Sequence, residues 1–197
     1  MSEAILSVSE LGAERSGRLV FSGLSFVAGP GTALRIAGAN GAGKTTLLRI
    51  LAGLSAPAAG SVQWATCRRI FVGHAHAMND SLDVIDNLRY AARLAGLSGE
   101  ETALRQALAR LEVAHLARRR YGSLSQGQRK RASLARLFLS SADAVWLLDE
   151  PFVALDHASQ RQLAELIDQR VAAGGLVLYT SHQEVALSGG QLAEVAL

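Results

Sequence analysis

Two periods of hydrophobicity alternate along the chain, one of two residues and one of about 3.6 residues. Apolar side chains alternate with others in residues 32–37, as in a β-strand, whereas residues 144–148 and 176–180 are continuous apolar runs typical of buried parallel strands. Short apolar runs in residues 5–8 and 19–27, separated by Gly and Ser, predict a small N-terminal sheet. Buried strands that alternate with helices predict an α/β protein.

The helical period dominates the middle of the chain. From Ser81 the apolar residues recur on one helical face until Gly96, a residue that commonly ends helices. Residues 98–101 have the spacing of a capping box, which predicts that a second helix follows at once. A further helix is expected to begin after Leu124 and to continue to Ser140. The pattern therefore predicts an α-helical subdomain, at about residues 81–140, inserted in the α/β core.

The composition limits the class of protein. A chain of 197 residues is long enough for one sizeable core, and we expect a single domain spanning residues 1–197. The net charge of +3 comes without an aromatic stripe or a recognition-helix pattern, so we expect no nucleic-acid partner. A single cysteine, Cys67, excludes an internal disulfide and suits a reducing compartment. Since neither a secretory signal nor a long apolar run is present, the sequence favours a cytoplasmic location.

The strand at 32–37 and the helix after it enclose a glycine-rich loop with the pattern G-x-x-x-x-G-K-T. This pattern is typical of a phosphate-binding loop, whose backbone N–H groups surround the phosphates at a helix N-terminus. Lysine supplies a charge to the β- and γ-phosphates, and the following threonine hydroxyl is a ligand of Mg²⁺. The predicted nucleotide-binding residues are Gly38, Ala39, Asn40, Gly41, Ala42, Gly43, Lys44, Thr45 and Thr46.

Acidic residues and a histidine follow two of the predicted buried strands. Asp149 and Glu150 come directly after residues 144–148, and His182 follows residues 176–180. Because the carboxyl ends of parallel strands meet at one edge of a sheet, these side chains are expected beside the phosphate loop. Asp149 would bind Mg²⁺ through water, Glu150 would orient or deprotonate the attacking water, and His182 would bond the γ-phosphate.

A second anion site is predicted where the basic helix begins. Ser125 is placed to cap that helix, and its free N–H groups would suit a γ-phosphate approached from the side opposite the loop.

The order and spacing of five motifs identify a family. The phosphate loop, residues 124–128, the strand ending in Asp149-Glu150-Pro151, residues 154–156, and Ser181-His182 together resemble an ABC-transporter ATPase. The resemblance spans nearly the whole chain. It implies an α/β P-loop NTPase core with an N-terminal antiparallel β subdomain and an inserted α-helical subdomain, with ATP and Mg²⁺ as cofactors.

The resemblance also implies how the residues act. Two copies would form a head-to-tail homodimer around two ATP molecules, with Ser125, Gly127 and Gln128 of one copy closing over ATP held by Lys44 of the other. Glu150 would be the catalytic base, His182 the switch, Asp156 the link between the two sites, and Thr45 and Asp149 the metal ligands. The helical insertion would contact integral membrane subunits.

Within that family the chain is similar to the ATP-binding subunit of the haem exporter of cytochrome c maturation. Stretches such as residues 124–131, 146–152 and 179–183 support this similarity. It implies a peripheral protein at the cytoplasmic face of the inner membrane. Because the chain has no C-x-x-C-H motif, no direct haem binding is expected.

Three positions depart from the usual pattern or imitate it. Ala75 stands where the family has the glutamine that touches Mg²⁺, and Arg15 aligns with the aromatic that stacks on adenine, which a guanidinium can also do. Residues 124–128 are the family's signature motif in this chain. Residues 187–191 read L-S-G-G-Q, which is the commoner form of that motif, yet they follow the switch histidine and lead into only a few residues. We interpret them as a turn.

The alternatives to a haem-exporter motor are another small transporter ATPase, an ATP-gated regulatory clamp with slow hydrolysis, and a soluble ABC ATPase without a membrane partner. Turnover distinguishes a motor from a clamp, and co-purification with a membrane protein distinguishes it from a soluble ATPase.

Overall fold

The chain folds into two compact units, each described by itself. The computed structural model describes residues 4–65, 68–73, 77–141, 143–182 and 185–197. The first unit contains Met1–Phe71, Ala142–Glu150 and Ala164–Leu197, and the second contains Val72–Ser141 and Pro151–Leu163. No helix within the described ranges combines the length and the apolar character needed to cross a bilayer.

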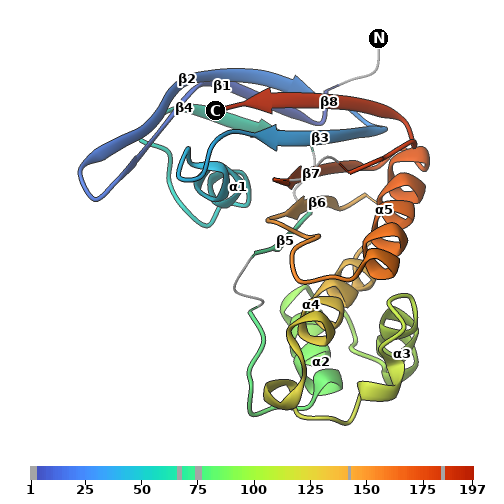
Figure 1. Cartoon of the computed structure of the whole chain (residues 1–197). Coiled ribbons are helices and arrows are strands. Elements are labelled where there is room, and N and C mark those ends of the chain that lie inside the picture. Colours follow the sequence, from blue (N-terminus) through green and yellow to red (C-terminus); the bar gives the residue numbers. More distant parts are fainter. Residues whose placement is uncertain (1–3, 66–67, 74–76, 142, 183–184) are drawn as a thin grey trace. The chain divides into compact units, whose positions relative to one another are not determined.

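The first unit begins with an antiparallel sheet of strand order β2-β1-β4, as the N-terminal pattern predicts (Figure 1). Its strands are β1 (Leu6–Arg15), β2 (Arg18–Ala28) and β4 (Ala59–Trp64). Ser16 and Gly17 connect β1 to β2 with positive φ angles of 51° and 74°. A two-residue hairpin turn of this kind requires positive φ at both central residues, and it brings Arg15 opposite Arg18 at the end of the hairpin.

The second sheet of this unit has the strand order β5-β6-β7-β3-β8. Its strands are β3 (Thr32–Ala37), β5 (Arg69–Val72), β6 (Val145–Leu148), β7 (Leu176–Thr180) and β8 (Gln191–Ala196). Strand β3 pairs in parallel with both β7 and β8, and β6 pairs in parallel with β7. The two continuous apolar runs are therefore parallel strands, and every residue of β6 and β7 is buried.

Strand β8 is a difference from the sequence analysis, which expected only a turn and a few residues there. Residues 187–190 do form an irregular segment, but Gln191 opens a strand of six residues. Its burial alternates between exposed and half-buried because it lies at the edge of the sheet. An edge strand needs little apolar sequence, since its main contacts are backbone hydrogen bonds to β3.

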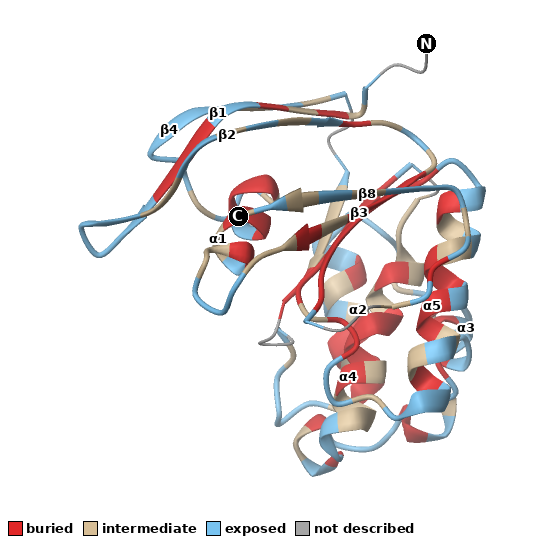
Figure 2. Ribbon diagram, turned by 45° about the horizontal axis from the view of Figure 1, so that its top comes forward, coloured by how far each residue is buried: buried red, intermediate tan, exposed pale blue. Residues whose placement is uncertain are grey.

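One helix joins the two sheets of the first unit into a common core. Helix α1 (Lys44–Leu51) packs Leu47, Leu48 and Leu51, all 0% exposed, into a cluster with residues of β1, β3, β6 and β7 (Figures 1 and 2). Each such side chain contributes about 1.5–3 kcal/mol relative to exposure. The start of α1, which carries the phosphate loop, is therefore held on a rigid base.

Helix α5 (His157–Ala172) begins two residues earlier than residue 159, where the sequence pattern places it. Asp156 caps it, because its Oδ1 accepts the N–H of Ser159 at 2.8 Å and its carbonyl accepts the N–H of Gln160 at 2.9 Å. The backbone N–H of Ser159 is also the largest cause that lowers the pKa of the Asp156 carboxyl below its ordinary value.

The second unit contains helices α2 (Val84–Leu94), α3 (Glu101–Ala109) and α4 (Gln126–Leu134). Gly96 has a φ of 77° two residues after α2, as expected for a helix stop. Short 3₁₀ turns occupy Ala114–Leu116, Tyr121–Ser123 and Ala135–Leu139, so the helix predicted to run to Ser140 changes its winding at Ala135.

The capping box expected at residues 98–101 is wrong. Glu100 is the N-cap of α3, and its side chain makes no capping hydrogen bond. The carboxylate of Glu101 instead accepts from Arg105 and Arg118, which also lowers its pKa, and bonds Arg89 at 3.5 Å. The Glu101 carboxylate, which would accept a backbone N–H in a capping box, is therefore occupied by three arginine side chains.

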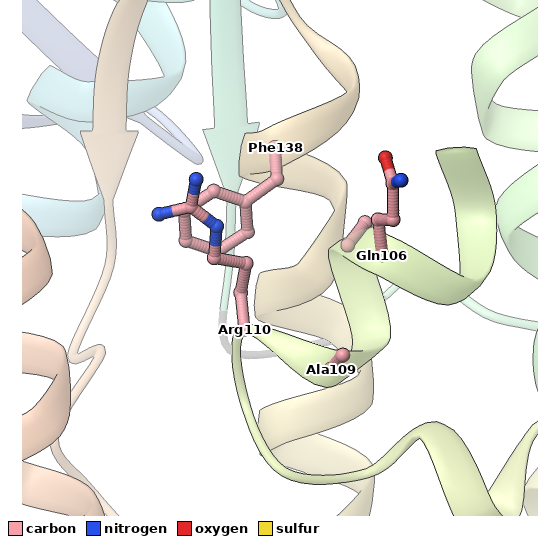
Figure 3. Close-up of a pocket in the computed structure, with 5 residues that line it drawn as sticks. Gln106, Ala109, Arg110 and Phe138 are labelled. Carbon is pink, nitrogen blue, oxygen red and sulfur yellow. The ribbon is translucent and has the colours of Figure 1, made fainter. Parts of the chain in front are cut away.

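The end of α3 and the 3₁₀ turn at Ala135–Leu139 border a cavity of about 640 Å³ in the second unit. Figure 3 shows the Arg110 side chain over the ring of Phe138, with the guanidinium carbon 5.8 Å from the ring centre.

Candidate nucleotide-binding site

The phosphate loop lies between β3 and α1. Gly43 is the N-cap of α1 and has a φ of 106°. A Cβ atom at this position would come within 2.5 Å of Val20 Cγ1 and 2.9 Å of Phe21 Cδ1, both on β2. The loop therefore needs glycine here for two reasons, namely the left-handed backbone and the close approach of the neighbouring strand.

Lys44 lies folded over its own loop. Its side chain is buried, and Nζ donates to the carbonyl oxygens of Gly38 at 2.7 Å and Ala39 at 2.9 Å. An ammonium group has three N–H donors, so one remains beyond these two bonds. The loop carbonyls thus hold the positive charge at the N-terminus of α1, where an anion is favoured.

Asp149 lies at the carboxyl end of β6 and is 2% exposed. Its carboxylate accepts the hydroxyl of Thr45, with Thr45 Oγ1 at 2.9 Å from Oδ2 and 3.1 Å from Oδ1. The fold therefore brings together the threonine and the aspartate that the sequence predicts as metal ligands, although 104 positions separate them. Both side chains present oxygen atoms at the start of α1.

Glu150 has an unusual backbone for a residue with a side chain, a φ of +48°. Its N–H donates to Thr180 Oγ1 at 2.8 Å, which helps to hold this conformation. Its carboxylate Oε1 lies 2.9 Å from His182 Nε2. Strained backbone of this kind is concentrated at functional sites, and here it directs the carboxylate to the predicted switch histidine at the end of β7.

Thr180 is a site residue that the sequence analysis missed. It is 0% exposed, and its hydroxyl donates to Asp149 Oδ1 at 3.0 Å while it accepts the Glu150 N–H. One hydroxyl therefore positions both carboxylate residues. A polar residue at the end of the apolar run 176–180, adjacent to His182, was the signal that could have identified it.

Replacing Thr180 with valine should destabilise the protein by about 1–3 kcal/mol, because the Glu150 N–H loses its acceptor in a buried site. ATP turnover should fall roughly tenfold to a hundredfold, since both carboxylates lose their common anchor. Urea unfolding and steady-state hydrolysis measure the two effects. Thr180→Ser, which keeps the hydroxyl, is the matched control, and equal turnover in the valine and serine variants would contradict the positioning role.

Arg15 lies at the end of β1 and lines a cavity of about 360 Å³ in the first unit. Thr45 and Thr46 line the same cavity from the start of α1. The position that the sequence analysis assigns to base stacking is therefore next to the helix that carries the phosphate loop.

The predicted N-cap at Ser125 is confirmed in the second unit. Ser125 Oγ accepts the N–H of Gln128 at 3.3 Å, and Gln128 Oε1 accepts the N–H of Ser125 at 3.1 Å, which completes a capping box. A Cβ at Gly127 would lie 3.0 Å from the carbonyl oxygen of Ala154, so the first turn of α4 packs closely against the segment before Asp156.

The L-S-G-G-Q segment at 187–191 is held by a single carboxylate of α5. Asp168 accepts the N–H groups of Ser188 and Gly189 at 2.9–3.0 Å and the Ser188 hydroxyl at 2.9 Å. These groups are therefore engaged within the chain, whereas a phosphate-binding signature needs them free. Ala75, at the glutamine position, lies outside the described residues.

A parallel sheet with a phosphate loop between its strand β3 and a helix, and with acidic residues at the end of β6, defines an α/β nucleoside triphosphatase of the P-loop class. The profile of the family described as "ABC transporter" matches residues 21–153, and the chain belongs to this family. The family description and the similarity to ATP-binding export proteins together make the chain an ATP-binding and ATP-hydrolysing transporter subunit, as the motifs predict.

The most informative relatives are cytochrome c biogenesis ATP-binding export proteins CcmA. The chain is 44% identical over 194 residues to the one from Aromatoleum aromaticum, covering 93% of this chain and 91% of that protein. It is 39% identical over 200 residues to the one from Methylococcus capsulatus, covering 96% of each. A solved ATP-binding subunit of an ABC transporter, 23% identical, matches the fold with a TM-score of 0.79 over 90% of this chain and 79% of that chain.

Proposed function

We propose that this chain hydrolyses ATP to power a membrane complex of cytochrome c maturation, and that the complex exports haem or releases a haem-loaded chaperone. The main observation in support is a set of hydrogen bonds at the carboxyl ends of β6 and β7. These bonds bring together Thr45, Asp149, Glu150 and His182. The names of its CcmA relatives support the export role.

Each residue has a distinct part in the proposed reaction. The loop amides and Lys44 bind the β- and γ-phosphates. Thr46 binds a phosphate farther from the bond that is hydrolysed, and Arg15 faces the base. Glu150 accepts the proton of the attacking water, and His182, at 2.9 Å from Glu150, orients that carboxylate. General-base catalysis of this kind contributes roughly 100- to 10,000-fold in rate.

The oxygen atoms near Lys44 fit Mg²⁺. Thr45 Oγ1 and the Asp149 carboxylate lie within 3.1 Å of each other, and both are the hard oxygen donors that this cation prefers. No cluster of three or more metal-binding side chains occurs among the described residues, which agrees with a cation held by one or two protein oxygens plus substrate phosphates. When bound there, Mg²⁺ neutralises charge on the phosphates.

The proposed working form is a head-to-tail homodimer with two ATP molecules. Ser125, Gly127 and Gln128 of one copy would close over the phosphates held by Lys44 of the other, and Asp156 would link the two sites. We propose that both units act as one ATPase domain over residues 1–197, held by integral membrane subunits at the cytoplasmic face of the inner membrane. The capped start of α4 supports the proposed closure over the phosphates, because the N–H groups at a helix start favour anions.

The test is complementation of a bacterium that lacks its own ATP-binding subunit for cytochrome c maturation. The chain, expressed in that bacterium, should restore c-type cytochromes that stain for covalently bound haem, and it should co-purify with the membrane subunits of the host's maturation complex. An active ATPase that restores no c-type cytochrome would overturn the haem role but leave the ATPase role intact.

A further inference from the structure

We infer that Arg129 is a positioning residue for the proposed closure between two copies. Its guanidinium group holds the start of α4 in the conformation that receives the ATP of the second copy, and Asp80 connects this conformation to the segment of residues 79–82. The inference rests on the proposed head-to-tail dimer, and it adds a residue that acts through Ser125 rather than on the nucleotide itself.

The Arg129 side chain folds back onto the turn that leads into α4. Its Nε donates to the carbonyl oxygen of Leu124 at 3.1 Å, and a terminal nitrogen donates to the carbonyl oxygen of Gly122. One guanidinium group therefore fixes two carbonyl groups of the segment directly before the N-cap Ser125. A planar group with five N–H donors can form such a fork, whereas the ammonium group of lysine acts as a point charge.

Tyr121 connects the same turn to α4 in the opposite direction. Its hydroxyl donates to the carbonyl oxygen of Arg129 at 3.1 Å, and the Arg129 guanidinium carbon lies 5.5 Å from the centre of its ring. Tyr121 is buried, with 2% of its surface exposed. The turn at residues 121–124 and the first turn of α4 thus bond each other in both directions. The direction of the N–H groups at the start of α4, where an anion is favoured, therefore depends on these bonds.

Asp80 joins this cluster from the segment before α2. Its Oδ1 lies 3.5 Å from a terminal nitrogen of Arg129, and its carbonyl oxygen accepts the N–H of Gly122 at 3.0 Å. A Cβ atom at Gly122 would lie 2.8 Å from that carbonyl oxygen, so the two segments are in close contact. Asn87 of α2 fixes the segment in turn, because its side chain bonds the N–H and the carbonyl oxygen of Asn79 at 2.7 and 3.0 Å. A movement of this segment would consequently reach the start of α4 through Arg129.

Amide hydrogen exchange of the full chain tests the positioning role without nucleotide and without a second copy. Arg129→Met keeps an unbranched side chain but removes every donor. Exchange in residues 121–130 should become at least about tenfold faster, because local opening no longer breaks two hydrogen bonds to a charged group. Exchange in α3 should stay unchanged, which separates this local effect from a loss of global stability. Arg129→Lys, which can bond only one of the two carbonyl groups well, should give an intermediate rate.

The second measurement is the ATP-dependent dimer, followed by analytical ultracentrifugation with Mg²⁺ in the Glu150→Gln background. Arg129→Met should raise the dissociation constant of the dimer at least about tenfold. ATP binding to the single chain should be unchanged, because the phosphate loop belongs to the first unit and Arg129 to the second. Asp80→Asn should raise the dimer constant only about twofold to fivefold, since 66% of the Asp80 side chain is exposed and exposed ion pairs contribute little.

Arg93→Met is the matched control in the second unit. Arg93 is exposed on α2, and its side chain has no ion-pair or hydrogen-bond partner in the part of the chain that the structure describes. This variant should show wild-type exchange and a wild-type dimer constant, and effects equal to those of Arg129→Met would overturn the inference.

A folded Arg129→Met protein with wild-type exchange in residues 121–130, or with an unaltered dimer constant, also overturns it. If Arg129→Met does not fold, Arg129→Lys and Asp80→Asn receive the same two measurements, and wild-type values in both variants overturn the inference. Absence of the dimer in Glu150→Gln with Arg129 intact refutes the closure itself and the positioning role with it, so the two failures are distinguishable.

Discussion

Lys44→Ala is expected to weaken ATP binding by at least about a hundredfold and to abolish hydrolysis. A charge-assisted hydrogen bond contributes about 1.5–3 kcal/mol, and the lysine would make more than one to the phosphates. The substitution also removes the ammonium group that donates to the carbonyl oxygens of Gly38 and Ala39, so the loop loses both its positive charge and two of its hydrogen bonds.

Thermal unfolding with and without ATP measures this effect independently of turnover. A ligand at a hundred times its dissociation constant stabilises a protein by about 2.7 kcal/mol, which corresponds to roughly 5–10 °C for a chain of this length. The wild type should show this shift with Mg²⁺ and ATP, and Lys44→Ala should show none. Arg93→Ala, in an exposed position of α2, serves as the control and should behave as the wild type. An equal shift in both variants would contradict the assigned role.

The sequence predicts the elements around the loop well because their signals are local. Strands β3 and β7 have the bounds that periodicity predicts, since one alternates and the other is continuously apolar. The glycine pattern requires a positive φ that few other residues adopt, and the structure shows it at Gly38, Gly41 and Gly43. These features depend on residues close together in the chain.

The errors arise where distant residues decide the outcome. Strand β8 depends on backbone pairing with β3, which its own sequence does not reveal. The box at residues 98–101 was wrong because Arg118, seventeen positions away, bonds the same carboxylate as Arg105. Thr180 was missed since its role comes from its bonds to residues 30 and 31 positions distant.

The same reasoning limits what sequence can say of the signature residues. Ser125 as an N-cap follows from local spacing, and the capping box with Gln128 bears this out. Its proposed contact with nucleotide involves a second copy, so neither spacing nor the fold of one chain supplies it. That contact rests on the family resemblance and is best tested through the dimer.

Glu150→Gln is expected to retain ATP binding while turnover falls roughly 100- to 10,000-fold, because an amide cannot accept the proton of the attacking water. Glutamine has the same shape, and its amide oxygen can still accept a hydrogen bond from His182 if that nitrogen carries a proton. The backbone bond from residue 150 to Thr180 does not involve the side chain and is retained. The ATP-bound state should therefore accumulate, and with it the head-to-tail dimer.

Size-exclusion chromatography with Mg²⁺ and ATP measures the dimer, and phosphate release measures turnover. Glu112→Gln is a matched control, since Glu112 is an exposed glutamate with a φ of 58°, also positive, in the second unit. It should hydrolyse ATP as the wild type does and should not accumulate as a dimer. Adding Ser125→Arg to Glu150→Gln should prevent the dimer, because the bulky charge blocks the capped start of α4. A Glu150→Gln protein that stays monomeric with ATP bound would refute closure between two copies, and one that retains full turnover would refute Glu150 as the base.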